Sequence, residues 1–330
     1  MPRRIRPILA LLALLAPPFA SAAPNAAPSP YAALAATEAR VAAIGFRLTT
    51  ANAAWCPVRQ AQMGIIWGDR RLYDEQQWES ARAAYETGAF DTSFVAAAAP
   101  GSPAGRSGLK KGDAIAWVDF RPLDEGDGSD PFGRIAALER LLAARSADAK
   151  IMIGLTDGRT IPLRMVPGCV SDFRVEPKEK PGAVADGRLV LINQGLADFT
   201  ADDNELAAAI AHELAHNILR HRERLDAVGV DRGLGKQFGR SARLFRQTEI
   251  EADRLSVWLL AGADYDPAAA ARFWSKFGQR SGRPLFQAGT HPGWRDRVKA
   301  LEAEAATIAA ARAAGQPLRP PLVDAPPPLE

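Results

Sequence analysis

The sequence has only two cysteines, Cys56 and Cys169, and no long apolar run after its first residues. A helix that spans a membrane needs about 20 mostly apolar residues, so no stable membrane insertion is expected of the mature chain. Hydrophobic residues make up 47% and charged residues 24% of the 330 positions, an ordinary balance for a soluble protein. The length allows two modest domains, each with its own core.

The first 22 residues have the pattern of a cleaved secretory signal. Three arginines precede an apolar run at residues 8–16, and the small residues Ala20-Ser21-Ala22 follow a Pro-Pro pair. A membrane anchor is the alternative, but this run is too short to cross a bilayer as a helix. We expect cleavage near Ala22 and a periplasmic or otherwise exported protein. Cleavage lowers the formal charge from +3 to zero, so the composition does not indicate nucleic-acid binding.

Residues 52–169 are predicted to form a small β-rich domain, because short apolar runs there are separated by Gly, Pro and Asp. A lead-in segment, residues 23–51, comes before it, with a helix at residues 31–43 and a possible first strand at residues 44–48. Inside the domain, helices are expected at residues 81–85 and 134–144, and strands at residues 94–96, 114–118, 151–155 and 160–165.

One segment of this region resembles a known domain. Residues 100–115, PGSPAGRSGLKKGDAI, are similar to the "pGSPA…aGL.GD.I" segment of bacterial PDZ domains, and Asp157-Gly158-Arg159 is similar to the turn of that family's last hairpin. The resemblance covers residues 65–167 and implies a module that binds an extended peptide at an exposed sheet edge. The loop Met63-Gly64-Ile65-Ile66 is a candidate for binding the peptide's carboxylate, with an ordinary strand start as the alternative.

Cys56 and Cys169 lie just outside the two ends of the PDZ-like region. Domain termini are often close together, and an exported chain meets an oxidising space, so we expect a disulfide between them. Two buried free thiols are the alternative.

The sequence His212-Glu213-Leu214-Ala215-His216 is an HExxH motif inside a predicted helix. At about 100° per residue the two histidines share one helical face, so both imidazoles can reach a single metal ion. Glu213 stands next to His212, where its carboxylate can act as a general base on a metal-bound water. An accidental match on an amphipathic helix is the alternative.

The start of this helix is marked by Asp202, which can cap the first turn, and by Glu205, which completes a capping box. Apolar side chains then recur at every fourth position and give the helix a buried face: Leu206, Ile210, Leu214 and Ile218.

A third histidine ligand is not expected close to the motif. Leu219 and Arg222 stand where the longer HExxHxxGxxH pattern has Gly and His. His221 follows His212 by nine residues, which on a continuous helix places it on the opposite side. We therefore expect a solvated or structural role for His221.

The next acid-rich helix offers a third ligand. Glu249 and Asp253 are four residues apart and share a face, whereas Glu251 points away from it. A Glu ligand with an Asp one turn later can complete a His-His-Glu metal shell and orient a ligating imidazole. The alternatives are a solvated charged face and, for Glu251, reciprocal capping with Thr248.

Three pieces of the sequence resemble the HtpX-like zinc metallopeptidases, gluzincins that include the CAAX prenyl proteases and a BepA-like periplasmic branch. They are HELAH at residues 212–216, the Glu249/Asp253 pair, and Thr290-His291-Pro292 followed by Arg297. The resemblance covers residues 186–301. Unlike HtpX, this sequence has no transmembrane helices, which puts membrane-embedded substrates in doubt.

The resemblance implies one zinc ion per chain, held by His212, His216 and Glu249. It also implies Glu213 as general base and Asp253 as a supporting catalytic acid. In relatives the histidine that matches His291 lies near the zinc, which implies a gating or oxyanion-stabilising role. Capping of the helix after Pro292 is the alternative for His291.

The remaining elements are expected around this motif in residues 170–315. The apolar strand at residues 189–192 is predicted to be the edge that binds extended substrate, with a core strand as the alternative. A mobile loop is expected at residues 229–239, a helix from Asp266-Pro267 to Gly278, and a last helix at residues 294–314. The Pro-rich tail, residues 316–330, is expected to be disordered.

The sequence thus predicts an α+β protein with a mainly helical metalloprotease domain and a short substrate-edge sheet, preceded by the β-rich PDZ-like domain. The expected function is a periplasmic zinc-dependent endopeptidase that acts on protein or peptide substrates in the envelope. A chaperone-like or scaffolding PDZ protein with little proteolysis is one alternative, and zinc-dependent hydrolysis of a non-protein substrate is another.

Overall fold

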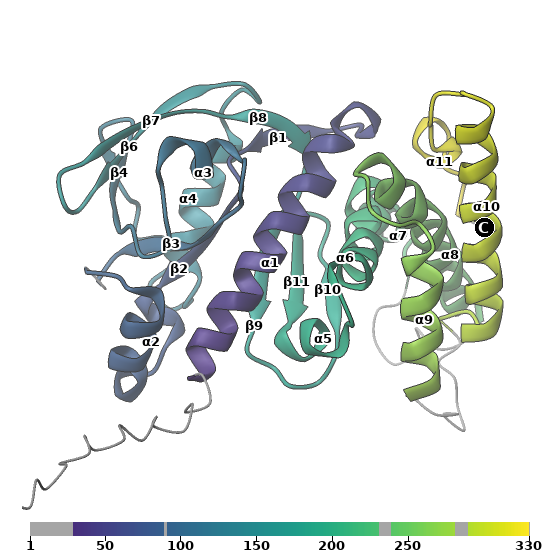
Figure 1. Ribbon diagram of the computed structural model, residues 1–330, viewed down its shortest axis with the longest axis horizontal. Helices are drawn as coiled ribbons and strands as arrows, with labels where there is room; N and C mark the ends of the chain where they lie inside the picture. The colour runs from purple at the N-terminus through teal and green to yellow at the C-terminus, as the bar shows by residue number, and fades with distance from the viewer. Residues whose placement is uncertain (1–28, 89–90, 231–238, 281–289, 330) are drawn as a thin grey trace, which may run out of the picture.

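The computed structural model describes residues 29–88, 91–230, 239–280 and 290–329, and these form a mixed α and β structure, as the α+β prediction required. The β-rich part and the helical part lie on opposite sides of one long helix (Figure 1). The signal-like residues 1–22 lie outside the described residues. Among the described helices, none combines the length and the apolar character needed to cross a bilayer.

The long helix is α1 (Pro30–Ala51), which begins where the side chain of Ser29 accepts a hydrogen bond from the backbone N–H of Ala32. The predicted strand at residues 44–48 is wrong, because the helix runs on through it. Val41, Ile44 and Leu48 follow one another at helical spacing and are almost completely buried. Helix α1 contacts strands β3 and β8 on one side and β9 and helix α6 on the other, so it joins both parts of the molecule.

The β-rich part contains the helices and strands predicted between residues 81 and 165. The four-stranded sheet has the order β5-β4-β6-β7 and the smaller sheet pairs β2 with β3. The bounds are β2 (Ile65–Asp69), α2 (Trp78–Tyr85), β3 (Ser93–Ala98), α3 (Pro103–Ser107), β4 (Ile115–Val118), β5 (Arg121–Pro122), α4 (Gly133–Ala143), β6 (Lys150–Leu155) and β7 (Thr160–Arg164). The predicted hairpin turn at residues 157–159 joins β6 to β7, with Gly158 at a φ of 88°.

Both ends of the β-rich part meet. Strand β1 (Arg59–Gln62) pairs antiparallel with β8 (Val166–Cys169), and a disulfide joins Cys56 to Cys169, as the sequence predicted. The disulfide therefore joins the two ends of this part, just before the chain continues into the sheet described next.

The second sheet has the order β10-β11-β9, formed by β9 (Asp172–Glu176), β10 (Ala183–Ala185) and β11 (Leu189–Asn193). The sequence prediction that residues 189–192 form the edge strand is wrong. Strand β11 is central, with Val190 and Ile192 fully buried, whereas β10 is the edge strand, and the side chain of its Val184 is exposed. An apolar run such as LVLI is typical of a strand that is covered on both faces, so the core-strand alternative holds.

The helical part is built from α5 (Gln194–Phe199), α6 (Asp203–Ile218), α7 (His221–Ala227), α8 (Gly239–Gly262), α9 (Ala269–Arg280) and α10 (Trp294–Ala313). Helix α6 begins as predicted, because the Asp202 side chain accepts hydrogen bonds from the N–H groups of Asn204 and Glu205. The predicted loop at residues 229–239 falls largely outside the described residues.

Two predictions about the C-terminal part are wrong. Gly278 does not end helix α9, because its missing side chain leaves room for the Trp294 ring inside a continuing helix. The tail is not disordered over its described residues either: it forms the short helix α11 (Pro321–Asp324), with Leu322 buried near Ile218 and Leu219. Apolar contact thus outweighs the Pro-rich composition.

Candidate metal centre

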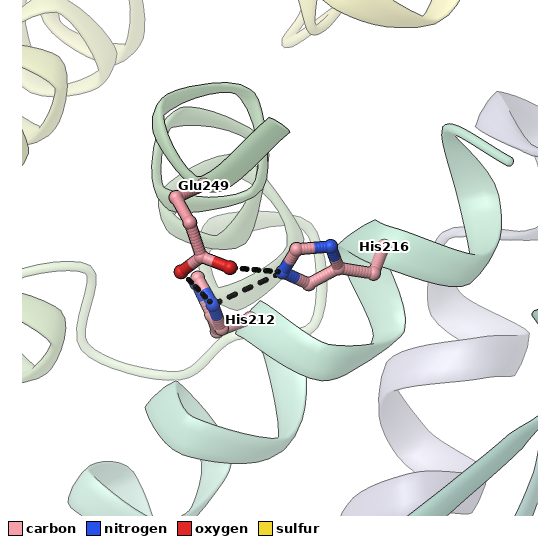
Figure 2. Close-up of side chains that lie close together, drawn as sticks. All are labelled: His212, His216 and Glu249. Carbon is pink, nitrogen blue, oxygen red and sulfur yellow. Dashed lines mark hydrogen bonds and ion pairs between the residues drawn. The ribbon is translucent and has the colours of Figure 1, made fainter. Parts of the chain in front are cut away.

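Helices α6 and α8 pack against each other and bring three candidate ligands together. Nε2 of His212 lies 3.2 Å from Nε2 of His216 and 3.4 Å from a carboxylate oxygen of Glu249. The other Glu249 oxygen lies 3.5 Å from Nε2 of His216. Figure 2 shows the two imidazoles rising from one helix to meet the carboxylate from the other.

These separations fit a zinc ion. Tetrahedral zinc holds nitrogen and oxygen ligands at about 2.0–2.2 Å, which places neighbouring ligand atoms roughly 3.3–3.6 Å apart. The observed spacings of 3.2, 3.4 and 3.5 Å lie close to this range, the last two being measured to different oxygens of the Glu249 carboxylate. Three protein ligands from two histidines and one glutamate are also the donor set of catalytic zinc sites that keep their fourth position open.

The predicted supporting acid, Asp253, lies one turn after Glu249 and contacts the first ligand. Its Oδ1 is 3.0 Å from Nδ1 of His212, and both side chains are buried. A histidine that binds metal through Nε2 carries its proton on Nδ1, so Asp253 accepts that proton in a hydrogen bond and fixes the ring.

Arg297 from α10 completes this arrangement. Its guanidinium donates to both carboxylate oxygens of Asp253, at 2.5 and 2.7 Å, and lies over the Trp274 ring at 3.3 Å from the ring centre. From the sequence, Arg297 was identified only as part of a motif and had no predicted role. A buried arginine needs an acidic partner, and the acid-rich helix α8 was the available signal.

The charges around the ligands explain their pKa values. Burial and Arg297 lower the pKa of His212, but its contacts with Asp253 and Glu249 outweigh them and raise it to about 9. Burial opposes ionisation of Glu249, yet His212, His216 and Arg297 hold its pKa well below the usual range. Glu249 is therefore a carboxylate, the form that binds a cation.

Glu213, the predicted general base, lies beside the ligands and next to strand β10. Burial raises its pKa to about 7, while the nearby His212 charge and a backbone hydrogen bond from Ala185 act in the opposite direction. A carboxylate whose pKa lies near neutral pH can both accept and return a proton in that range.

A cavity of about 560 Å³ opens above these groups. Its lining includes strand β10 with its preceding Gly182 and three aromatic side chains of α9, Phe273, Trp274 and Phe277. A volume of this size accommodates a short stretch of an extended polymer or a small molecule.

His291 stands at the rim of the cavity rather than among the three ligands. Its Nε2 is 3.6 Å from the nearest Glu249 oxygen, its side chain is 50% exposed, and its Nδ1 lies 2.9 Å from the Thr290 hydroxyl. The helix-capping alternative is wrong, because α10 begins after Gly293 without any side-chain cap.

His221 and Glu251 lie in places that the sequence reasoning did not foresee. Helix α6 ends at Ile218, and Arg220 adopts a left-handed conformation with φ of 54°, which turns the chain back. His221 is therefore buried beside His216, and Glu251 bonds to His221 instead of capping with Thr248. Sequence gave no signal for this turn, because Gly and Asn are the residues that usually adopt it.

Comparison with known proteins finds relatives of the part of the chain that carries this centre. The sequence profile of Peptidase family M48 matches residues 175–232 and 232–305, which include all six predicted site residues. The mitochondrial metalloendopeptidase OMA1 of Schizosaccharomyces pombe is 28% identical over 140 residues, covering 36% of this chain and 42% of the relative. OMA1 of Arabidopsis thaliana is 31% identical over 147 residues, covering 38% of this chain and 29% of the relative.

This chain therefore spans less than half the length of these two relatives. The two relatives are metalloendopeptidases by name and the profile is that of a peptidase family, which agrees with the geometry of the candidate ligands. Residues 175–305 are similar in sequence to Peptidase family M48, and the candidate metal centre lies within this part of the chain.

Proposed function

We propose that the protein is a zinc endopeptidase that is exported to the periplasm and cleaves envelope proteins there, misfolded ones included. The observation that carries this proposal is the His212, His216 and Glu249 group at the base of a 560 Å³ cavity, with Glu213 beside it. The names of the two relatives, both metalloendopeptidases, support cleavage inside a chain.

The residues of the cavity divide the chemistry among them. A zinc ion held by the three ligands supplies Lewis acidity, which lowers the pKa of a water molecule and stabilises negative charge on a carbonyl oxygen. Glu213 accepts the proton of the attacking water at its carboxylate and passes it to the nitrogen of the leaving amine. His291, at the rim, is placed to donate a hydrogen bond to the developing oxyanion or to close the entrance.

The position of strand β10 supports the proposal that the substrate is a peptide. The strand pairs with β11 on one side, and among the described strands none pairs with its other edge, where the Ala185 N–H bonds to Glu213 in the cavity wall. An extended peptide that pairs with this edge places its main chain beside Glu213 and the ligands. Recognition through backbone hydrogen bonds suits many sequences, as cleavage of unfolded proteins requires.

The PDZ-like part is proposed to select substrates or to regulate access. Residues 63–65 of the candidate carboxylate-binding loop and side chains of α4 line a cavity of only about 40 Å³. Beside it, Arg174 on β9 forms a 2.5 Å ion pair with Glu139 on α4. A peptide that enters this groove has to displace these contacts. Strand β9 belongs to the same sheet as β10, so a shift of β9 on peptide binding can move the edge of β10 that is proposed to bind substrate.

The signal-like N-terminal residues and the disulfide support export. A disulfide persists in oxidising compartments such as the periplasm and is rare in reducing ones.

Cleavage of casein by the zinc-loaded protein tests the function. We expect fragments cut at internal bonds, seen by mass spectrometry, and a loss of about 100- to 10,000-fold in rate for Glu213→Gln, with zinc content unchanged. Glu302→Gln, the same change at an exposed site on α10, is the matched control and should cleave as the wild type does.

Full activity in Glu213→Gln would refute the role of this residue. A zinc-loaded wild-type protein that binds casein without cutting it would instead favour the scaffolding or chaperone function.

A further inference from the structure

The second ligand, His216, has a hydrogen-bonding partner of its own on the side away from the metal position. Its Nδ1 lies 2.9 Å from Nδ1 of His221, whose Nε2 lies 3.1 Å from Glu251 Oε2. His221 and Glu251 are 2% and 3% exposed, so neither contact competes with bulk water.

His216, His221 and Glu251 form a hydrogen-bonded row, and metal binding determines which atom of each imidazole carries a proton. If Nε2 of His216 holds the metal, its proton is on Nδ1, and Nδ1 of His221 must accept it. The remaining proton of His221 is then on Nε2, where the carboxylate of Glu251 accepts it. Every donor thus faces an acceptor, and the row has one consistent arrangement.

Glu251 is held in place from its far side. Arg224 on α7 donates to Oε2 at 2.6 Å, and Gln247 on α8 donates to Oε1 at 3.0 Å. The same two side chains also donate to backbone carbonyls of the C-terminal tail, to Pro327 at 2.6 Å and Pro328 at 2.8 Å. The carboxylate is therefore anchored by α7, α8 and the tail together.

The row does for His216 what Asp253 does for His212: it provides an acceptor for the Nδ1 proton of the imidazole. Asp253 reaches Nδ1 of His212 directly, at 3.0 Å, whereas His221 bridges between His216 and the Glu251 carboxylate. The left-handed residue Arg220 makes this possible, because it ends α6 and turns His221 back onto the preceding ring.

We propose that His221 is a positioning residue for the metal ligand His216, with Glu251 fixing the orientation of the His221 ring. This proposal rests on the proposed zinc site. His221 does not touch the metal or the substrate; it accepts the Nδ1 proton of His216 and so keeps Nε2 directed at the metal. Partners of this kind raise metal affinity by about 10–100-fold.

Zinc affinity of the purified full-length protein, measured by competition with a chromophoric chelator, tests the proposal. We expect His221→Leu to bind zinc about 10–100-fold more weakly than the wild type. His221→Asn places an amide oxygen where Nδ1 was, keeps an acceptor for His216, and should recover most of the affinity. The visible spectrum of the cobalt(II)-loaded protein should change in His221→Leu and return toward that of the wild type in His221→Asn.

A purely structural role would give a different result. In that case the thermal stability of the metal-free protein falls in both variants while zinc affinity and the cobalt spectrum stay as in the wild type, which overturns the proposal. If His221→Leu does not fold, Glu251→Gln replaces it: His221 stays in place but loses its anionic acceptor, and zinc should bind several-fold more weakly. Unchanged affinity in that variant also overturns the proposal.

The proposed role of His221 can be wrong while the proposed function is right, and the experiments distinguish the two cases. If the wild type binds no zinc, or if Glu249→Ala binds it as tightly as the wild type, the zinc site itself is wrong. If the wild type binds zinc and cleaves casein but His221→Leu binds zinc equally well, only the role of His221 is wrong.

Discussion

Asp253 lies between His212 and Arg297 and bonds to both: its Oδ1 is 3.0 Å from Nδ1 of the imidazole, and the guanidinium donates to both of its oxygens. All three side chains are buried. The carboxylate is thus fixed from two sides by groups on α6 and α10, and the imidazole it contacts cannot rotate without losing a hydrogen bond.

Asp253→Asn should therefore weaken zinc binding by about 10–100-fold, because the amide accepts the His212 proton less strongly and leaves Arg297 without its counter-charge. Titration of the metal-free protein with zinc measures the change. Asp264→Asn is the matched control, an exposed aspartate at the end of α8 in a left-handed conformation that asparagine also adopts. Equal zinc affinity in Asp253→Asn and the wild type would contradict the orienting role.

Removal of the metal should lower stability, since a zinc ion held by the proposed ligands would join α6 to α8. A ligand that binds only the folded state stabilises it by about 2.7 kcal/mol when its concentration is 100 times the dissociation constant. Differential scanning calorimetry with zinc and with a chelator should show the wild type melting at a lower temperature in the chelator. In His216→Ala the two melting temperatures should converge, and an unchanged difference there would place the stabilising zinc elsewhere.

The sequence identified the two pairs of candidate site residues because the spacing within each pair depends on local geometry. His212 and His216 are one helical turn apart, and so are Glu249 and Asp253, which means that helix periodicity alone brings each pair to one face. The cap at Asp202 is equally local. Within each helix the predictions needed no knowledge of how the helices pack, whereas the meeting of Glu249 with the two histidines depends on the packing of α6 against α8.

The wrong predictions concern features that depend on tertiary contacts. Strand β11 was taken as an edge, but no local signal shows that β10 pairs outside it. Gly278 was taken as a helix end, and only the packing of Trp294 explains why it is not one. His221 was placed by extending a helix that in fact ends three residues earlier, at Ile218.

The disulfide should contribute strongly to stability. Cys56 and Cys169 are separated by 113 residues in sequence, and closing so long a loop restricts the unfolded chain. The double variant Cys56→Ser/Cys169→Ser should lose about 3–5 kcal/mol in the free energy of unfolding, measured with urea. The intact protein should show no free thiol by mass spectrometry under non-reducing conditions. Two alkylated cysteines in the unreduced protein would contradict the bridge.

Glu38 on α1 should make stability depend on pH. The residue is 6% exposed, and the Tyr85 hydroxyl donates to its carboxyl group at 2.7 Å. Burial raises the pKa of Glu38 to about 8, with the Tyr85 bond acting in the opposite direction. Burial also raises the pKa values of the neighbouring Tyr73 and Tyr85, so neither tyrosine titrates below that pH.

In the unfolded chain a glutamate has a pKa of about 4.3, so the folded state binds the Glu38 proton more tightly. Its contribution to stability is complete below that value and is lost as pH rises toward 8, at about 1.4 kcal/mol per pH unit. Glu38→Gln keeps a neutral acceptor for Tyr85 and should remove this dependence. Urea unfolding from pH 5 to 8.5 should show the variant gaining on the wild type as pH rises. The exposed Glu79→Gln on α2 should follow the wild type, and parallel profiles for Glu38→Gln and the wild type would show that Glu38 is ionised in the folded protein throughout this range.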